Sequence, residues 1–143
     1  MSASRLHIYH RLQLAAHRIQ KSADRALLGA AEVTAAQAAV LAITASAGEL
    51  TQRDVARRLG INESAVTAMV SRLMSMGLLE RARDDADARA WQLRTTREGE
   101  AVLKRSAHSF AKVNARIEAV LDERELEQLA RSLKRIAEAF TES

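Results

Sequence analysis

Small polar side chains line one face of the segment that follows Asn62. If this segment is an α-helix at 100° per residue, its outward positions lie between about 100° and 240° from Val66. Solvated helix faces usually carry Glu and Lys, but this one has none. Hydroxyls can bond base edges or phosphates, methyls can contact thymine methyls, and arginine can reach a phosphate or guanine, so the pattern indicates docking in a DNA major groove. The face comprises Ser64, Thr67, Ala68, Ser71, Arg72 and Ser75.

The beginning of this helix has its own chemistry. Asn62 is a predicted N-cap, and Glu63 and Ser64 occupy the first turn. Recognition helices direct this end at the bases, and free backbone amides there suit a phosphate oxygen. We therefore count Asn62, Glu63 and Ser64 among the candidate DNA-binding residues. An ordinary solvated polar face remains the alternative for this helix.

A predicted β-hairpin with a charged tip follows at residues 79–95, where short segments alternate between apolar and polar residues. Arg81 and Arg83 lie on its first strand, and Asp87 and Arg89 lie at its tip. Arginine suits the narrow, negative minor groove, so Arg89 is a candidate groove contact that Asp87 orients. Because the tip carries mixed charges, a solvated loop is the alternative.

Two helices joined by a tight turn must position these groups. Val55 and Leu59 anchor the first helix, and the small Ala56 lets the second helix cross closely. Gly60 permits the left-handed backbone of the turn, and Ile61 fills the corner. The stretch that starts at Thr51 resembles a capping box. The residues expected to bury the second helix are Val66, Met69, Val70 and Leu73.

Amphipathic helices flank this unit, at residues 5–28 before Gly29 and over 97–141 after Thr96. The second range comprises a helix over about 97–120 and a last helix capped by Asp122. Because the central unit can form a core without them, we expect their apolar faces to bury against a second protomer. Packing within one protomer is the alternative. The last helix carries a heptad-like seam, expected inside, of Leu126, Leu129, Leu133, Ile136 and Phe140.

The whole chain of 143 residues is expected to be a single domain, 1–143, in the mainly α class with a small β-hairpin wing (α+β). Its 48% hydrophobic residues suffice for a core, and the absence of proline favours long helices. Residues 34–96 form a winged helix-turn-helix DNA-binding region between N- and C-terminal dimerisation helices. The net charge of +4 is compatible with an anionic partner.

Several classes of protein are excluded or disfavoured. There is no cysteine, which excludes disulfides, thiolate metal sites and thiol redox sensing. No nucleophile–base pair, phosphate-binding glycine loop or metal-ligand spacing is recognisable, so we expect neither an enzyme nor a cofactor. No apolar run approaches the roughly 20 residues that span a bilayer, and the N-terminus lacks a signal peptide's apolar core. We expect a cytoplasmic protein without a membrane partner.

Over nearly its whole length, the chain resembles the MarR family of winged-helix transcriptional regulators. The resemblance covers the helix-turn-helix, the turn into the first strand, the wing and the start of the following helix. The matching residues are 50–56, Leu59-Gly60-Ile61, Ser64-Ala65-Val66-Thr67, Val70-Ser71-Arg72-Leu73, Gly77-Leu78-Leu79-Glu80-Arg81, Asp87-Ala88-Arg89 and Thr96-Arg97-Glu98-Gly99.

The resemblance implies a homodimer of six-helix protomers that binds double-stranded DNA at a palindromic operator. The first and last two helices would interlock, the wings would straddle the DNA, and Arg89 would contact the minor groove. We expect a sequence-specific repressor. Two residues depart from the family pattern: Ala88 stands where a second basic residue is common, and Thr95 stands at a usually apolar position.

The resemblance also implies a small phenolic or anionic effector between the dimerisation helices and the winged helix. Candidate lining residues on the first helix are His7, His10, Arg11 and His17. Three histidines in eleven residues suggest a metal, but no carboxylate joins them at ligand spacing, so we predict no metal site. Partly exposed or interface histidines are the alternative.

One different function remains compatible with the sequence. A winged-helix module that binds proteins and does not read DNA would also use the seam from Leu126 to Phe140. Salt-insensitive binding to a protein, without affinity for DNA, would distinguish it.

Overall fold

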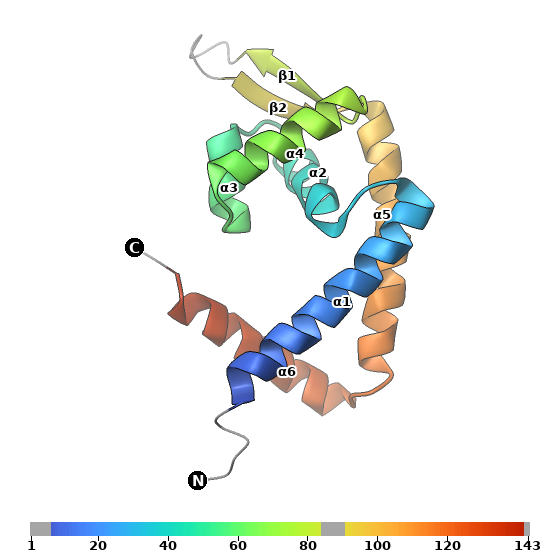
Figure 1. Cartoon of the computed structure of the whole chain (residues 1–143), viewed down its shortest axis with the longest axis vertical. Coiled ribbons are helices and arrows are strands. Elements are labelled where there is room, and N and C mark those ends of the chain that lie inside the picture. Colours follow the sequence, from blue (N-terminus) through green and yellow to red (C-terminus); the bar gives the residue numbers. More distant parts are fainter. Residues whose placement is uncertain (1–6, 84–90, 142–143) are drawn as a thin grey trace. The chain divides into compact units, whose positions relative to one another are not determined.

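The computed structural model describes residues 7–83 and 91–141 (Figure 1). The chain divides into two compact units, Met1–Ser109 and Phe110–Ser143. The described residues form six α-helices and one antiparallel two-stranded hairpin. The expected class, mainly α with a small β-hairpin, is thereby confirmed.

The first unit begins with α1 (Ile8–Ala31) and α2 (Ala35–Ala47). Thr34 caps α2 in a full capping box with Gln37. The expected end of the first helix at Gly29 was wrong. The helix continues through Gly29 because Leu27 and Ala31 are buried, and it ends at Glu32 in a left-handed conformation.

The helix-turn-helix consists of α3 (Gln52–Leu59) and α4 (Glu63–Ser75), joined at Gly60 with φ +67°. Caps define both beginnings: Thr51 forms a capping box with Asp54, and Asn62 accepts a hydrogen bond from the Ala65 amide. Leu59, Ile61 and Met69 are half-buried, at the edge of the core. The buried apolar residues of the two helices are Val55, Ala56, Val66, Val70 and Leu73.

The hairpin pairs β1 (Leu79–Arg83) with β2 (Trp91–Thr95), in a register that places Leu79 opposite Thr95 and Arg83 opposite Trp91. Leu50 adds an antiparallel bridge to Leu93, with amide-to-carbonyl distances of 3.5 and 2.7 Å. Leu93 is fully buried, so the hairpin is fixed to the core at this end. The tip between the strands lies outside the described residues.

The helix α5 (Arg97–Glu118) starts against the turn between α4 and β1. Thr96 caps it by accepting a hydrogen bond from the Gly99 amide, and its own hydroxyl donates to the Gly77 carbonyl at 2.6 Å. Thr95, at the usually apolar position, donates to the Leu41 carbonyl at 3.3 Å. The polar residue is thus accommodated by a hydrogen bond.

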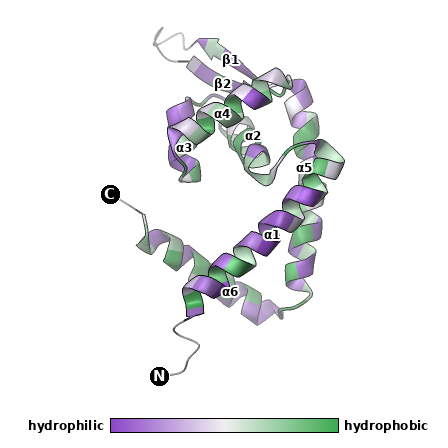
Figure 2. Ribbon diagram, viewed as in Figure 1, coloured by the Kyte–Doolittle hydropathy of each residue, from purple (hydrophilic) through white to green (hydrophobic). Residues whose placement is uncertain are grey.

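The second unit holds the end of α5 and the whole of α6 (Glu123–Ala139), which Asp122 caps in a capping box with Glu125. Figure 2 shows hydrophobic and hydrophilic residues alternating along α6. Within one chain this seam is not buried, so its expected burial against a second protomer stays a prediction. No residue of α6 is buried, and Leu129, Leu133, Ile136 and Phe140 are 39–83% exposed.

No single helix among the described residues has both the length and the apolar character to cross a membrane.

Candidate nucleic-acid interface

The outward face of α4 is open to solvent. Burying the opposite face against the core turns these side chains outward, and every predicted position is exposed. Apart from one arginine, no side chain on this face is longer than threonine, which lets the helix backbone approach a partner closely. The exposed residues are Ser64, Thr67, Ala68, Ser71, Arg72 and Ser75.

Three hydroxyls of this face already donate within the helix. Ser64 Oγ donates to Asn62 Oδ1 at 2.7 Å, and Thr67 Oγ1 donates to the Glu63 carbonyl at 2.8 Å. Ser75 Oγ donates to the Arg72 carbonyl at 2.7 Å. A hydroxyl carries one hydrogen, so these oxygens offer only acceptor sites to an external partner.

Glu63 is the only acidic residue within α4, and a cation faces it. Arg53 Nε lies 3.8 Å from Glu63 Oε1, and both side chains are exposed. The carboxylate is also favourably placed in the first turn of the helix, where the dipole is positive. The negative charge that would repel phosphates at this end is therefore partly offset.

Arginines outnumber acids around the helix-turn-helix. Between Thr51 and Gly77 there are four arginines and two acidic residues. Arg57 Nη1 lies 3.9 Å from Asp54 Oδ1. Within the part of the chain that the structure describes, Arg58 and Arg72 have no ion pair. Both are exposed and available to phosphates.

The hairpin arginines have partners that fix their positions. Arg81 Nη2 donates to Gln52 Oε1 at 3.4 Å, which links β1 to the first turn of α3. The Arg83 guanidinium stacks over the Trp91 ring, 5.0 Å from its centroid, at the last described pair of the hairpin. Asp87 and Arg89 lie outside the described residues.

Sequence reasoning missed Arg53, Gln52 and Trp91. Each contacts a predicted residue: Glu63, Arg81 and Arg83, respectively. The Arg83–Trp91 pair follows from the hairpin register and could have been found by aligning the two strands. The contact of Gln52 spans 29 positions and leaves no local signal in the sequence.

Asp54 holds the start of the helix-turn-helix. Hydrogen bonds from the Thr51 side chain and backbone amide lower the pKa of Asp54 below 3.8, and Arg57 and Arg58 lower it further. The carboxylate stays ionised at neutral pH and secures the beginning of α3, which crosses close to α4.

The predicted effector residues are exposed, His7 at the N-cap of α1 and the others on α1 itself. Two shallow depressions there, of about 670 and 590 Å³, share His17 and Gln20. His10 lines the first, and Lys21 and Arg25 line the second, whereas His7 and Arg11 line neither. Among residues 7–83 and 91–141, no group of three potential metal ligands converges.

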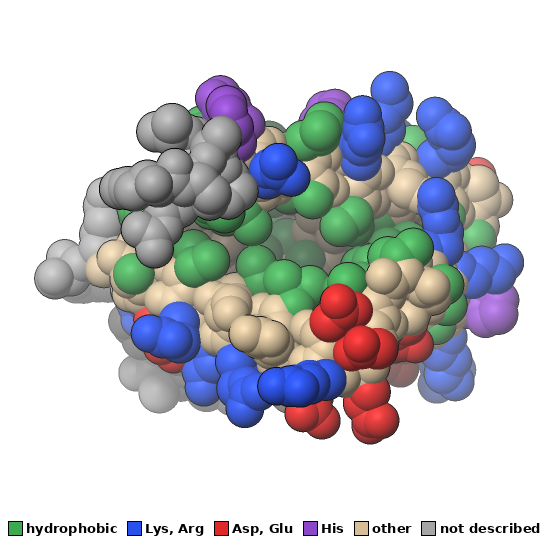
Figure 3. Space-filling model, turned by 90° about the horizontal axis from the view of Figure 1, so that it is seen from below, with side chains coloured by type: hydrophobic (Ala, Val, Ile, Leu, Met, Phe, Trp, Pro, Cys, Tyr) green, Lys and Arg blue, Asp and Glu red, His purple; other side chains and the backbone are tan. Residues whose placement is uncertain are grey.

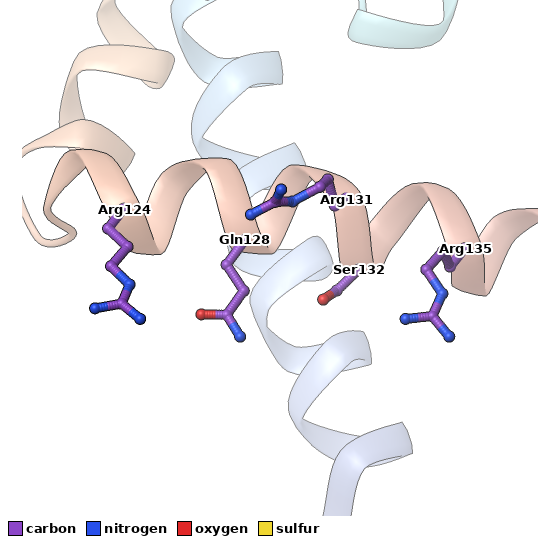
Figure 4. A pocket seen from close by; sticks show the side chains of 5 residues that line it. All are labelled: Arg124, Gln128, Arg131, Ser132 and Arg135. Carbon is purple, nitrogen blue, oxygen red and sulfur yellow. The ribbon is translucent and has the colours of Figure 1, made fainter.

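The helix α6 has two contrasting faces. The view in Figure 3 shows hydrophobic side chains exposed to solvent, with charged side chains of both signs also present. On the face of α6 opposite its leucines, arginines surround an open depression of about 350 Å³ (Figure 4). No ion pair involves these arginines within the described segments. The lining residues are Arg124, Gln128, Arg131, Ser132 and Arg135.

Comparison with known proteins gives consistent results. The model of the MarR family matches residues 31–90. The HTH-type transcriptional repressor MdtR of Bacillus subtilis (strain 168) is 33% identical over 107 residues, 75% of this chain and 69% of MdtR.

Solved structures extend the similarity to nearly the whole chain. The PcaV transcriptional regulator from Streptomyces coelicolor, solved with its natural ligand, is 32% identical and covers 94% of this chain and 92% of its own, with a TM-score of 0.79. The S. aureus MepR–DNA complex shares the fold, with a TM-score of 0.82 at 22% identity, covering 98% of this chain and 99% of MepR.

Proposed function

The chain belongs to the MarR family of winged-helix DNA-binding transcriptional regulators, which are not enzymes, and on this premise we propose that it is a homodimeric repressor. In this proposal, the α4 helices of two protomers enter successive major grooves of a palindromic operator. Half-sites about one helical turn apart match the two-fold symmetry of such a dimer.

The exposed face of α4 carries this proposal. Its short side chains and single arginine fit a groove that admits one helix, and the N-cap at Asn62 directs backbone amides toward phosphates. The proposed DNA contacts on this helix are Asn62, Glu63, Ser64, Thr67, Ala68, Ser71 and Arg72. MepR, which has the same fold, was solved bound to DNA.

The hairpin supplies a second contact. Arg81 and Arg83 lie along β1, where phosphates beside the occupied groove would meet them. Arg89 at the tip is proposed to enter the minor groove, with Asp87 orienting it. The Arg83–Trp91 contact stiffens the end of the two strands next to the tip.

A second protomer explains the exposed apolar residues. Helices in proteins are stabilised mostly by packing of their apolar face, but no residue of α6 is buried within this chain. Leu133 and Ile136 on α6, and Ile8 and Leu14 on α1, are all more than a third exposed. Burying these groups in a homodimer would stabilise both helices.

We further propose relief of repression by a small phenolic or anionic effector that binds beside α1. His17, Lys21 and Arg25 supply cationic or hydrogen-bonding groups in one depression, which Asp24 and Leu28 also line. His10 and His17 share the adjacent depression. PcaV, which is similar over most of its length, was solved with its natural ligand.

Binding to the DNA upstream of the protein's own gene tests the main proposal. A dimer should form a specific complex in a gel shift, with a Kd on the order of 10⁻⁸ to 10⁻¹¹ M at physiological salt. A folded dimer without a specific complex, together with salt-insensitive binding to a protein partner, would instead identify an interaction module.

A further inference from the structure

We propose that Thr67 and Ala68 select one A·T base pair in each half-site. The Thr67 and Ala68 methyl groups would contact the thymine C5-methyl, and Thr67 Oγ1 would accept a hydrogen bond from the adenine amino group. This inference rests on the proposed function, since it assigns a base preference to the exposed face of α4.

The hydrogen bond that the Thr67 hydroxyl already makes decides whether it can donate to a base or only accept from one. Its hydroxyl donates to the Glu63 carbonyl at 2.8 Å, within the helix. The oxygen therefore has lone pairs, but no free hydrogen, for a base. Ser64 is committed in the same way through Asn62 Oδ1. This part of the face can therefore only accept hydrogen bonds, so it would bind base groups that donate them.

The major groove offers two kinds of donor, the adenine N6 and the cytosine N4 amino groups. Only the A·T pair presents an apolar methyl group as well, on thymine. Acceptor oxygen and methyl group lie together on Thr67, and Ala68 adds a second methyl beside it. This combination matches A·T and lacks a complement for the methyl at G·C.

The surroundings of these two residues permit the contact. Thr67 and Ala68 are exposed, and the neighbouring Ser64 and Ser71 are short, so no long side chain holds the helix away from the bases. The bond to Glu63 also restricts the threonine rotamer. Little side-chain entropy would then be lost on binding.

Deoxyuridine substitution tests the methyl contact directly. A binding sequence is selected from a random pool of double-stranded DNA, and each thymine is then replaced singly by deoxyuridine, which lacks the methyl and keeps base pairing. We expect one thymine per half-site at which the replacement weakens wild-type binding about fourfold, the effect of one buried methylene. At other thymines the affinity should not change.

Two variants assign this effect to Thr67. Thr67→Ser keeps the hydroxyl and removes the methyl, so most of the discrimination between thymine and deoxyuridine at that position should disappear. Thr67→Val keeps a methyl and loses the acceptor, so it should retain that discrimination while binding more weakly. Thr141→Ser, which removes a methyl beyond the end of α6, is the control and should behave as wild type.

The results separate two failures. If a sequence is selected but no thymine responds to deoxyuridine, or Thr67→Ser leaves the response unchanged, the base assignment is overturned and the DNA-binding function stands. If no sequence is enriched from the pool, the proposed function itself fails, and the base assignment fails with it.

Discussion

Arg53 Nε lies 3.8 Å from Glu63 Oε1 and joins the two helices of the helix-turn-helix. This pair places a cation beside the one carboxylate at the beginning of the recognition helix α4. Its exposed position makes it a minor contribution to stability. Under the proposed function, the pair would set the electrostatic potential that approaching phosphates meet.

We expect Glu63→Gln to bind random-sequence DNA more tightly than wild type does. Removing the carboxylate deletes a repulsion and frees Arg53 to contact a phosphate. Fluorescence anisotropy on a scrambled duplex at two salt concentrations measures the effect. Glu127→Gln, at an exposed residue of α6, removes the same charge outside the helix-turn-helix and should change little. Weaker or unchanged binding by Glu63→Gln would contradict this role.

A close approach at Gly99 fixes the start of α5 beneath the hairpin. A Cβ built at Gly99 would overlap the Leu78 carbonyl oxygen and lie 2.7 Å from Thr95 Cγ2. We expect Gly99→Ala to lower the free energy of unfolding by about 1–3 kcal/mol, as overpacking does. Urea unfolding measures it.

Gly29→Ala is the matched control for Gly99→Ala. It lies in the last turn of α1, with no atom within 4 Å of a built Cβ. Because alanine is the better helix former, this variant should gain about 0.5–1 kcal/mol. If both substitutions shifted stability in the same direction, the packing assigned to Gly99 would be wrong.

The ends of the helices were predictable from the sequence where local interactions define them, and not where distant packing does. Thr34, Thr51, Asn62, Gly60 and Asp122 mark helix ends through interactions within four residues, so their roles were predictable. Gly29 carries the same local signal, but burial of Leu27 and Ala31 outweighs it.

Interactions between residues far apart in the sequence could not be predicted from it. The Thr96 hydroxyl reaches Gly77, and Arg81 reaches Gln52, across turns that composition does not specify. For the candidate site, the outward face of α4 followed from helical periodicity. That its hydroxyls act as acceptors could not be predicted, because the direction of the Thr67 hydroxyl depends on its rotamer.

The apolar face of α6 leads to a prediction about assembly. Leu133→Asp should dissociate the proposed dimer, because a carboxylate would then be buried where apolar side chains meet. Arg135→Asp, on the opposite face, should leave it intact. Sedimentation velocity over a range of concentrations distinguishes the two variants. A Leu133→Asp protein that remains dimeric would exclude this face from the interface.

The lowered pKa of Asp54 leads us to expect a loss of folding stability in acid. Its pKa is lowered in the folded protein by hydrogen bonds from Thr51, so its stabilising effect is complete above the unfolded value near 3.8. The effect is lost as the pH falls through the lower, folded value. The stability difference between wild type and Asp54→Asn should therefore be largest near pH 7 and shrink below pH of about 4. Thermal unfolding across this range measures it, and a difference independent of pH would refute the prediction.

The central claim is that the exposed Ser/Thr face of α4 meets DNA, and Ser71→Glu tests it most directly. An acid in the middle of this exposed face should repel phosphates without disturbing the core. The measurement is anisotropy against the selected operator, with circular dichroism as the check of folding. Ser132→Glu, on exposed α6, is the control. We predict a loss of at least about tenfold in affinity for Ser71→Glu alone. Wild-type affinity in a folded Ser71→Glu protein would contradict the account.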